Sequence, residues 1–500
     1  MRDPKSLAVL LLVSVAAGTA LAAAPAGESA EKRVDRAWRA RENKAERAEA
    51  IRLCEGLVGD AKVQPSLRSR AFEIWIDALR RDEKWDDAVA VSERWRKAFP
   101  DDKELQVHAY YTESDLLRQA KKDPEAVERL RALIRALPDD KAVVVDAHLR
   151  IAGIFLEGRR YAECRDEAEK AMQADPENAK AAAGALWLQA DAAYRTEDWE
   201  GAVALLKRLM ENPAWKETDF WRRRDARFRY GDCLDRLKKF ADEQAHYEAA
   251  EKAEPDPKQA QEYCLRAADA ALKAERPDDA LRACERVFVA HPEASDHWYA
   301  AQRTIADLHL KRGRFDEALQ AARILLDAAS DEGRVAEAAR FLAEALKGLD
   351  RNVARANAVL NYQRFGPDGE DAKPGTPDDL KDPLAAMPRP TWPDRERAFD
   401  EARKKAGDDA DAMRHRAMTY LYSGHPKEAL RCFVDAFGRS TQRDFQNLGR
   451  EMICVGARAV RGHAVGLDPF FAFVNCGPAG PDGKPGTADD LKDPFEPLLK

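Results

Sequence analysis

The chain has 500 residues, of which 45% are hydrophobic and 35% charged, so it holds enough apolar material for a folded protein. Its 83 basic and 90 acidic residues are interspersed and give a net charge of −7. This balance is typical of a solvated helical surface and argues against a nucleic-acid partner, which would need a basic patch. Alanine, leucine, glutamate, lysine and arginine are abundant and β-branched runs are few, so we expect an all-α chain.

The N-terminal segment 1–22 has the form of an export signal. Arg2 and Lys5 lie near the start, Leu7 to Ala17 is a short apolar run, and Ala20-Leu21-Ala22 fits a cleavage site. The run is too short to span a bilayer comfortably. We expect cleavage after Ala22 and a periplasmic or secreted mature chain, with an uncleaved membrane anchor as the alternative. No later stretch is long and apolar enough to cross a membrane.

The stretch from Ile151 to Pro176 predicts two amphipathic helices broken near Gly158. Small residues stand where the two helices must approach closely, and aromatic residues fill the wider gaps. The apolar positions at helical spacing are Ile151, Ala152 and Phe155, then Tyr161, Cys164, Ala168 and Ala171. Copies of this pattern occur along most of the chain, and a proline or a polar cluster closes each second helix.

This recurring pattern resembles the tetratricopeptide repeat, a helix–turn–helix unit of about 34 residues. The resemblance covers about four-fifths of the mature chain and implies a right-handed α-solenoid of roughly ten stacked hairpins. In this family the first helices line a concave groove that binds a protein or a peptide. The family's Lys/Asn clamp for a C-terminal carboxylate is not recognisable, so binding of chaperone tails is not expected.

A longer repeat begins after residue 300. The segment 313–319 aligns with 424–430, and at the same offset PGTPDDLKDP (374–383) aligns with PGTADDLKDP (485–494). Each copy holds a helical hairpin, two further helices and an acidic Gly/Pro loop. The predicted division is therefore a signal over 1–22, a solenoid over 23–298, one module over 299–386, a Pro-rich linker over 387–393 and a second module over 394–500.

The two acidic loops allow two main interpretations. Their shared carboxylates on a Gly-rich turn suit Ca²⁺, although the EF-hand order is missing. Alternatively, Thr376 or Thr487 caps a one-turn helix and an aspartate three residues later returns the contact; a docking surface is a third interpretation. The candidate Ca²⁺ ligands are Asp371, Asp378, Asp379 and Asp382 in the first loop and Asp482, Asp489, Asp490 and Asp493 in the second. No other cofactor is expected.

A second charged pattern lies on the first helices, where an aspartate recurs with a basic residue four positions later. Such a pair stabilises a helix by about 0.2–0.5 kcal/mol, so it serves either a solvated helix surface or a groove that holds an extended polypeptide. The pairs are Asp77 with Arg81, Asp191 with Arg195, Asp232 with Arg236, Asp269 with Lys273, and Asp307 with Lys311.

Catalytic motifs are missing: there is no HExxH, no Gly-rich phosphate loop and no GxSxG. Most of the eight cysteines are expected to be free and buried, and Cys454 with Cys476 is the pair that could form a disulfide. We therefore interpret the chain as a non-catalytic exported scaffold that binds a protein through a charged groove. The alternative is a Ca²⁺-dependent structural or cell-surface protein that uses the two acidic loops.

Overall fold

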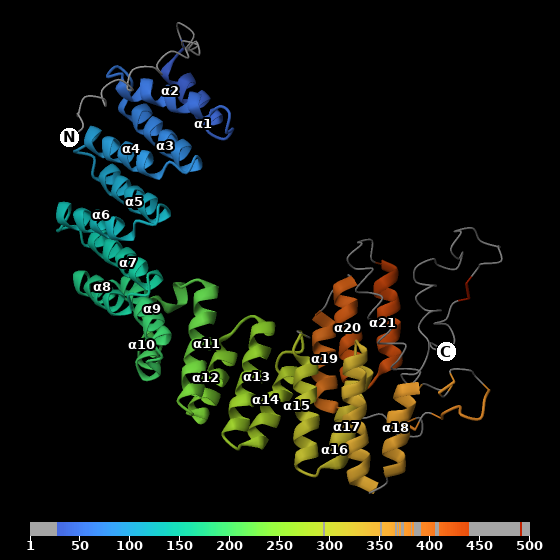
Figure 1. Ribbon diagram of the computed structural model, residues 1–500. Helices are drawn as coiled ribbons and strands as arrows, with labels where there is room; N and C mark the ends of the chain where they lie inside the picture. The colour runs from blue at the N-terminus through green and yellow to red at the C-terminus, as the bar shows by residue number, and fades with distance from the viewer. Residues whose placement is uncertain are drawn as a thin grey trace, which may run out of the picture. The chain divides into compact units, whose positions relative to one another are not determined.

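The computed structural model describes residues 28–439 and 491–492, apart from 294–295, 351–352, 366–367, 369, 372–374, 382, 385–391 and 406–409. These residues form 21 α-helices and one 3₁₀-helix, without a strand among them (Figure 1). The predicted all-α class and the stacked helical hairpins are confirmed. The chain divides into an N-terminal unit, 1–223, and a C-terminal unit, 224–500.

The N-terminal unit is a row of antiparallel hairpins in which consecutive helices pack together. Its helices are α1 (Ala30–Ala40), α2 (Arg47–Gly59), α3 (Pro65–Arg81), α4 (Trp85–Ala98), α5 (Lys103–Gln119), α6 (Asp123–Ala136), α7 (Lys141–Glu157), α8 (Tyr161–Ala174), α9 (Ala179–Arg195), α10 (Trp199–Glu211) and the 3₁₀-helix η1 (Pro213–Glu217).

The C-terminal unit begins within α11 and continues the same alternation. Its helices are α11 (Phe220–Arg236), α12 (Phe240–Ala253), α13 (Pro257–Lys273), α14 (Pro277–Val289), α15 (Trp298–Lys311), α16 (Phe315–Asp327), α17 (Glu332–Asp350), α18 (Val353–Phe365), α19 (Pro393–Lys405), α20 (Ala410–Tyr422) and α21 (Pro426–Arg439). We call the odd-numbered helices up to α17, together with α20, first helices, and the helix that follows each of them its second helix. Helix α16 begins at Phe315 and α21 at Pro426, which is the offset of the longer sequence repeat; the division of this region into two modules stays a prediction.

The repeat is longer than the predicted period of about 34 residues. The hairpin turns of the N-terminal unit place Glu83, Lys121, Arg159 and Glu197 at positive φ, between 57° and 59°, and these residues stand 38 positions apart. Each of the first helices α3, α5, α7 and α9 has 17 residues.

Each of these turns ends its first helix in the same way. The residue after the left-handed one donates its backbone N–H to a carbonyl five positions back, for example Lys122 to Leu117 at 2.8 Å and Arg160 to Phe155 at 2.7 Å. This contact satisfies a carbonyl that would otherwise be left open at the helix end. The first helix of the following hairpin then begins with a side-chain cap. The Asp102 carboxylate accepts a hydrogen bond from the backbone N–H of Leu105 at the start of α5, and the Asp140 carboxylate accepts one from that of Val143 at the start of α7.

Helix α19 contains an anchor that was not predicted from the sequence. Arg395, at the start of α19, has only 1% of its surface exposed and pairs with Glu285 of α14, Nη2 to Oε1, at 2.9 Å. Its Nη1 donates to Gln302 of α15 at 2.7 Å, and its guanidinium lies over the rings of Phe288 and Trp392 at 3.6 and 4.0 Å. One cation therefore ties α19 to two earlier helices.

Aromatic packing completes this contact. The ring of Trp298 lies 5.0 Å from that of Phe399 and 5.1 Å from that of Tyr422, and all three side chains are buried. Phe399 and Tyr422 belong to the same hydrophobic cluster as Val287 and Ile305. Helices α19–α21 thus share the core of α14–α16.

We expect Arg395→Ala to lower the free energy of unfolding by about 3 kcal/mol, because it removes the buried cation of an ion pair and leaves a void between two aromatic rings. Equilibrium urea unfolding followed by circular dichroism measures the change. The matched control is Arg397→Ala on the same helix, whose side chain is 79% exposed and should change stability by less than about 0.5 kcal/mol. Equal effects from the two variants would show that Arg395 is not an anchor.

Candidate functional site

The five predicted aspartate–cation pairs on the first helices all form. Each aspartate is the fifth residue from the end of its helix. The shortest nitrogen–oxygen distances are 2.9 Å for Asp77–Arg81 and Asp191–Arg195, 3.9 Å for Asp232–Arg236, 2.8 Å for Asp269–Lys273 and 2.7 Å for Asp307–Lys311. Asp191 is buried, whereas 57% of the Asp269 side chain and 40% of the Asp307 side chain are exposed. The exposed members are the ones that a partner can reach.

A further aspartate, which was not predicted from the sequence, occupies the same helix position. Asp115 is the fifth residue from the end of α5, but Gln119 replaces the cation four positions later. Its nearest cation comes from the next first helix, where Arg150 of α7 lies 4.0 Å away. Because α5 has no basic residue four positions after Asp115, the spacing that predicts the other pairs does not identify it.

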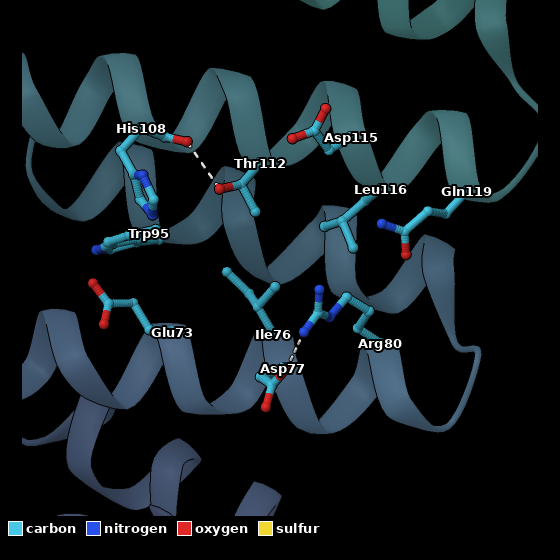
Figure 2. A pocket seen from close by; sticks show the side chains of 10 residues that line it. All are labelled: Glu73, Ile76, Asp77, Arg80, Trp95, His108, Thr112, Asp115, Leu116 and Gln119. Carbon is cyan, nitrogen blue, oxygen red and sulfur yellow. Dashed lines mark hydrogen bonds and ion pairs between the residues drawn. The ribbon is translucent and has the colours of Figure 1, made fainter. Parts of the chain in front are cut away.

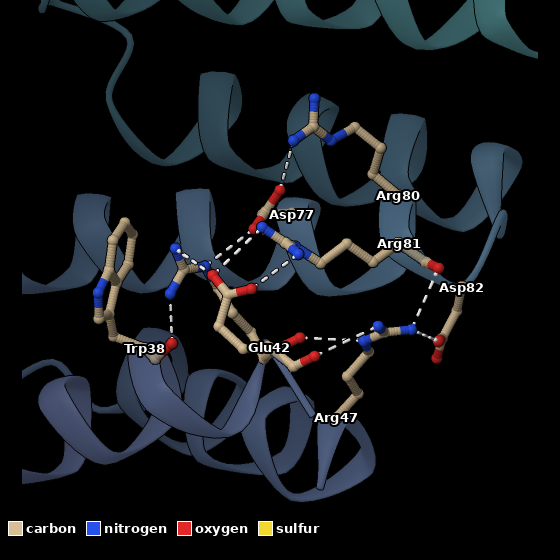
Figure 3. Close-up of polar contacts among 8 residues, drawn as sticks. Trp38, Glu42, Arg47, Asp77, Arg80, Arg81 and Asp82 are labelled. Carbon is tan, nitrogen blue, oxygen red and sulfur yellow. Dashed lines mark hydrogen bonds and ion pairs between the residues drawn. The ribbon is translucent and has the colours of Figure 1, made fainter. Parts of the chain in front are cut away.

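Asp77 connects two hairpins through a network of arginines (Figure 3). Its carboxylate accepts hydrogen bonds from Arg81 and from Arg41, which follows α1, both at 2.9 Å, and from Arg80 at 2.6 Å. Partial burial would raise the pKa of Asp77, but these hydrogen bonds outweigh burial and lower the pKa. Asp77 therefore fixes the first hairpin to the second, and its charge is largely neutralised.

A pocket of about 250 Å³ opens between α3 and α5 on the face that carries Asp77 and Asp115 (Figure 2). Two apolar side chains, Ile76 and Leu116, and the ring of Trp95 line it. Its polar lining comes from both first helices: Glu73, Asp77 and Arg80 from α3, and His108, Thr112, Asp115 and Gln119 from α5.

The α5 wall of this pocket follows one side of its helix. His108, Thr112, Asp115 and Gln119 are spaced by four, three and four residues, which places them on one face. The Thr112 hydroxyl donates to the His108 carbonyl at 2.9 Å, and the His108 ring meets the Trp95 ring edge-on at 5.3 Å. This polar stripe was the sequence signal that could have located the pocket.

Glu243 is a buried carboxyl group in the C-terminal unit. It is the fourth residue of α12, only 4% of its surface is exposed, and its Oε2 has no hydrogen-bond partner among the described residues. Burial raises the pKa of Glu243 to about 7; Lys273 and Arg266 oppose this increase, while Asp235 and Asp269 add to it. An acid that titrates near neutral pH therefore lies beside the Asp269–Lys273 pair.

Glu251, Cys264 and His291 bring ligand atoms within 4.8 Å of one another, as a metal site would require. The carboxylate is already engaged, however. Arg286 Nε lies 2.9 Å from one Glu251 oxygen and 3.2 Å from the other, and His291 Nε2 lies 3.1 Å from the carboxylate. Burial raises the pKa of Cys264, so its thiol is protonated beside the Glu251 carboxylate. We interpret this cluster as an ion-pair network that joins α12 to α14.

The described part of the first acidic loop forms a hydrogen-bonded turn. The Asp379 carboxylate accepts from the backbone N–H groups of Gly375 and Thr376 at 2.8 and 3.4 Å, which is the return contact expected of a capped turn. The Thr376 hydroxyl donates to Asp378 at 2.7 Å, and its oxygen lies 3.3 Å from an Asp371 oxygen. Ca²⁺ binding stays a prediction.

Several predicted features lie outside the described residues. They are the export signal, Asp382, all four candidate ligands of the second loop (Asp482, Asp489, Asp490 and Asp493), and the cysteines Cys454 and Cys476. Among the described cysteines, Cys54, Cys164, Cys233, Cys264 and Cys284 are free and buried, as expected. None of the helices in the described ranges is both long and apolar enough to cross a membrane.

Comparison with known proteins supports the repeat. Family models described as tetratricopeptide repeat match residues 184–213, 265–301 and 303–365. These segments carry tetratricopeptide repeats in α9–α10 and between α13 and α18. No curated protein matches the sequence.

Three solved structures are similar to the chain at low identity. A tetratricopeptide repeat protein from Parabacteroides merdae is 12% identical, with 52% of this chain and 93% of that chain covered and a TM-score of 0.31. The apo form of RapI is 12% identical, with 87% and 99% covered and a TM-score of 0.32. The TPR domain of P58(IPK) is 15% identical, with 79% and 98% covered and a TM-score of 0.20.

The raised pKa of Glu243 predicts a pH-dependent penalty on folding. A carboxyl group whose folded-state pKa lies above its ordinary value of 4.5 stabilises the fold only while it is protonated, so its contribution is lost as pH rises through about 7. We expect Glu243→Gln to stabilise the chain by on the order of 2 kcal/mol at pH 8 and by little at pH 4.5.

Thermal unfolding of the full chain at several pH values measures this difference. Asp242→Asn is the matched control, because Asp242 is exposed and adjacent on the same helix, and its effect should not vary in this way. A constant difference between Glu243→Gln and the unaltered chain at pH 4.5 and pH 8 would contradict the assignment.

Proposed function

We propose that the chain is an exported, non-catalytic scaffold that binds an extended polypeptide along the charged face of its first helices. A helical-repeat fold does not fix a function by itself, so the proposal depends on the site. The pocket between α3 and α5 carries the argument, because it opens beside Asp77 and Asp115 on the face that repeats along the stack. Stacked hairpins present such extended faces, and extended faces bind peptides.

The exposed aspartates at the fifth position from the end of the first helices support the same proposal in the C-terminal unit. Asp232, Asp269 and Asp307 are each at least 38% exposed at the side chain, although each lies beside a cation. An exposed ion pair contributes little to stability, typically below about 1 kcal/mol. These aspartates recur on an accessible face and contribute little to the stability of the fold, so they are available for contact with a partner.

We expect Asp232→Ala combined with Asp269→Ala to weaken peptide binding several-fold while costing about 1 kcal/mol or less of stability. Peptides would first be selected from a random peptide display library against the full chain, and their affinities measured by calorimetry. Asp242→Ala combined with Asp316→Ala removes the same charge from second helices and should leave affinity unchanged. Failure to select any peptide, or equal loss in both double variants, would contradict the proposal.

Export is the second part of the proposal, and it is carried by the N-terminal sequence. We expect protein recovered from the periplasm or the medium to begin at or near Ala23. Mass spectrometry of the N-terminal peptide measures this start. A cytosolic protein that retains Met1 would overturn it.

A further inference from the structure

We propose that the pocket between α3 and α5 receives the side chain of an arginine from the bound polypeptide. This inference rests on the proposed function and adds the chemistry of one recognised residue. Three carboxylates and one guanidinium line the pocket, from Glu73, Asp77, Asp115 and Arg80. The lining is therefore acidic, which disfavours an anionic group and favours a cation.

The carboxylates differ in what already neutralises them. Asp77 is engaged by three arginines, including Arg80 of the pocket wall, so this pair adds little net charge. Asp115 has Arg150 only at 4.0 Å. Glu73 is exposed and makes no hydrogen bond or ion pair within the described part of the chain. Glu73 and Asp115, which lie on opposite walls, are the groups left to bind a cation from outside.

The size and the apolar walls suit one long side chain. The volume of about 250 Å³ lies below the range of roughly 300–1,000 Å³ that holds a drug-sized ligand or cofactor. Ile76, Leu116 and Trp95 are at least 95% buried by the fold, yet each contributes to the pocket wall. An arginine stem packs along such apolar surface while its charged head remains beside the carboxylates.

The chain itself shows how its repeats hold an arginine. Around Arg395 the guanidinium meets a carboxylate from Glu285, an amide oxygen from Gln302 and the faces of two aromatic rings. The α3–α5 pocket offers the same three kinds of group: carboxylates, the Gln119 amide, and the Trp95 and His108 rings. This set favours arginine over lysine, because the planar guanidinium bonds carboxylates in a fork and stacks on rings.

The test uses the peptides selected against the full chain and replaces their arginine by citrulline, which keeps the shape and removes the charge. We expect an arginine in the selected consensus and a loss of affinity of about 10-fold or more with citrulline. On the protein side, Glu73→Gln combined with Asp115→Asn should weaken binding of the arginine peptide about 10-fold. The same variant should bind the citrulline peptide as well as the unaltered chain does.

Glu55→Gln combined with Glu200→Gln is the matched control, because both residues are exposed on second helices. Circular dichroism confirms that each variant folds. A consensus without arginine, or equal loss of both peptides on the Glu73/Asp115 variant, overturns the arginine pocket but leaves the scaffold function standing. Selection of no peptide at all overturns both.

Discussion

The structure depends on the close approach of the two helices within each hairpin. Among the described second helices, nine carry a small residue, alanine or cysteine, at their fourth position, and each is at least 95% buried: Ala50, Ala88, Ala126, Cys164, Ala202, Ala280, Ala318, Ala356 and Ala429. A larger side chain there would separate the helices and open the core. Since a single hairpin cannot bury its apolar face, the stack exists only if this spacing is kept in every unit.

Glu243 occupies this position in α12, and it shows what a departure costs. A carboxyl group takes the place of an alanine, keeps one oxygen without a partner among the described residues, and resists ionisation. The same hairpin carries another tight contact, because a Cβ at Gly231 would overlap the Tyr247 hydroxyl. Any larger residue at position 231 would force the buried Tyr247 ring to move. The α11–α12 hairpin therefore combines a buried carboxyl oxygen without a hydrogen-bond partner among the described residues and a tight Gly231–Tyr247 contact. Both lie in the hairpin that precedes the exposed Asp269 of α13.

Much of the fold could be predicted from sequence because its determinants are local. Small and aromatic residues at helical spacing, with a proline or a polar cluster after each second helix, identify hairpins one at a time. The features that were missed depend on contacts between distant residues. Arg395 lies in the charged segment Asp394–Arg397, which is typical of a solvated helix end, and its partner Glu285 is 110 residues away. Asp115 was missed because its cation lies on another helix, so no spacing within α5 reveals the pair.

The left-handed turn residues have a consequence for how such a chain can change in length. Glu83, Lys121, Arg159 and Glu197 are equivalent positions in successive hairpins. A deletion or duplication that joins one of these turns to another keeps the turn geometry, the helix caps and the small buried residues in register. Recombination between them therefore adds or removes whole hairpins, whereas a change of any other size shifts every later contact. The charged face of the first helices can be lengthened in discrete steps without a new fold.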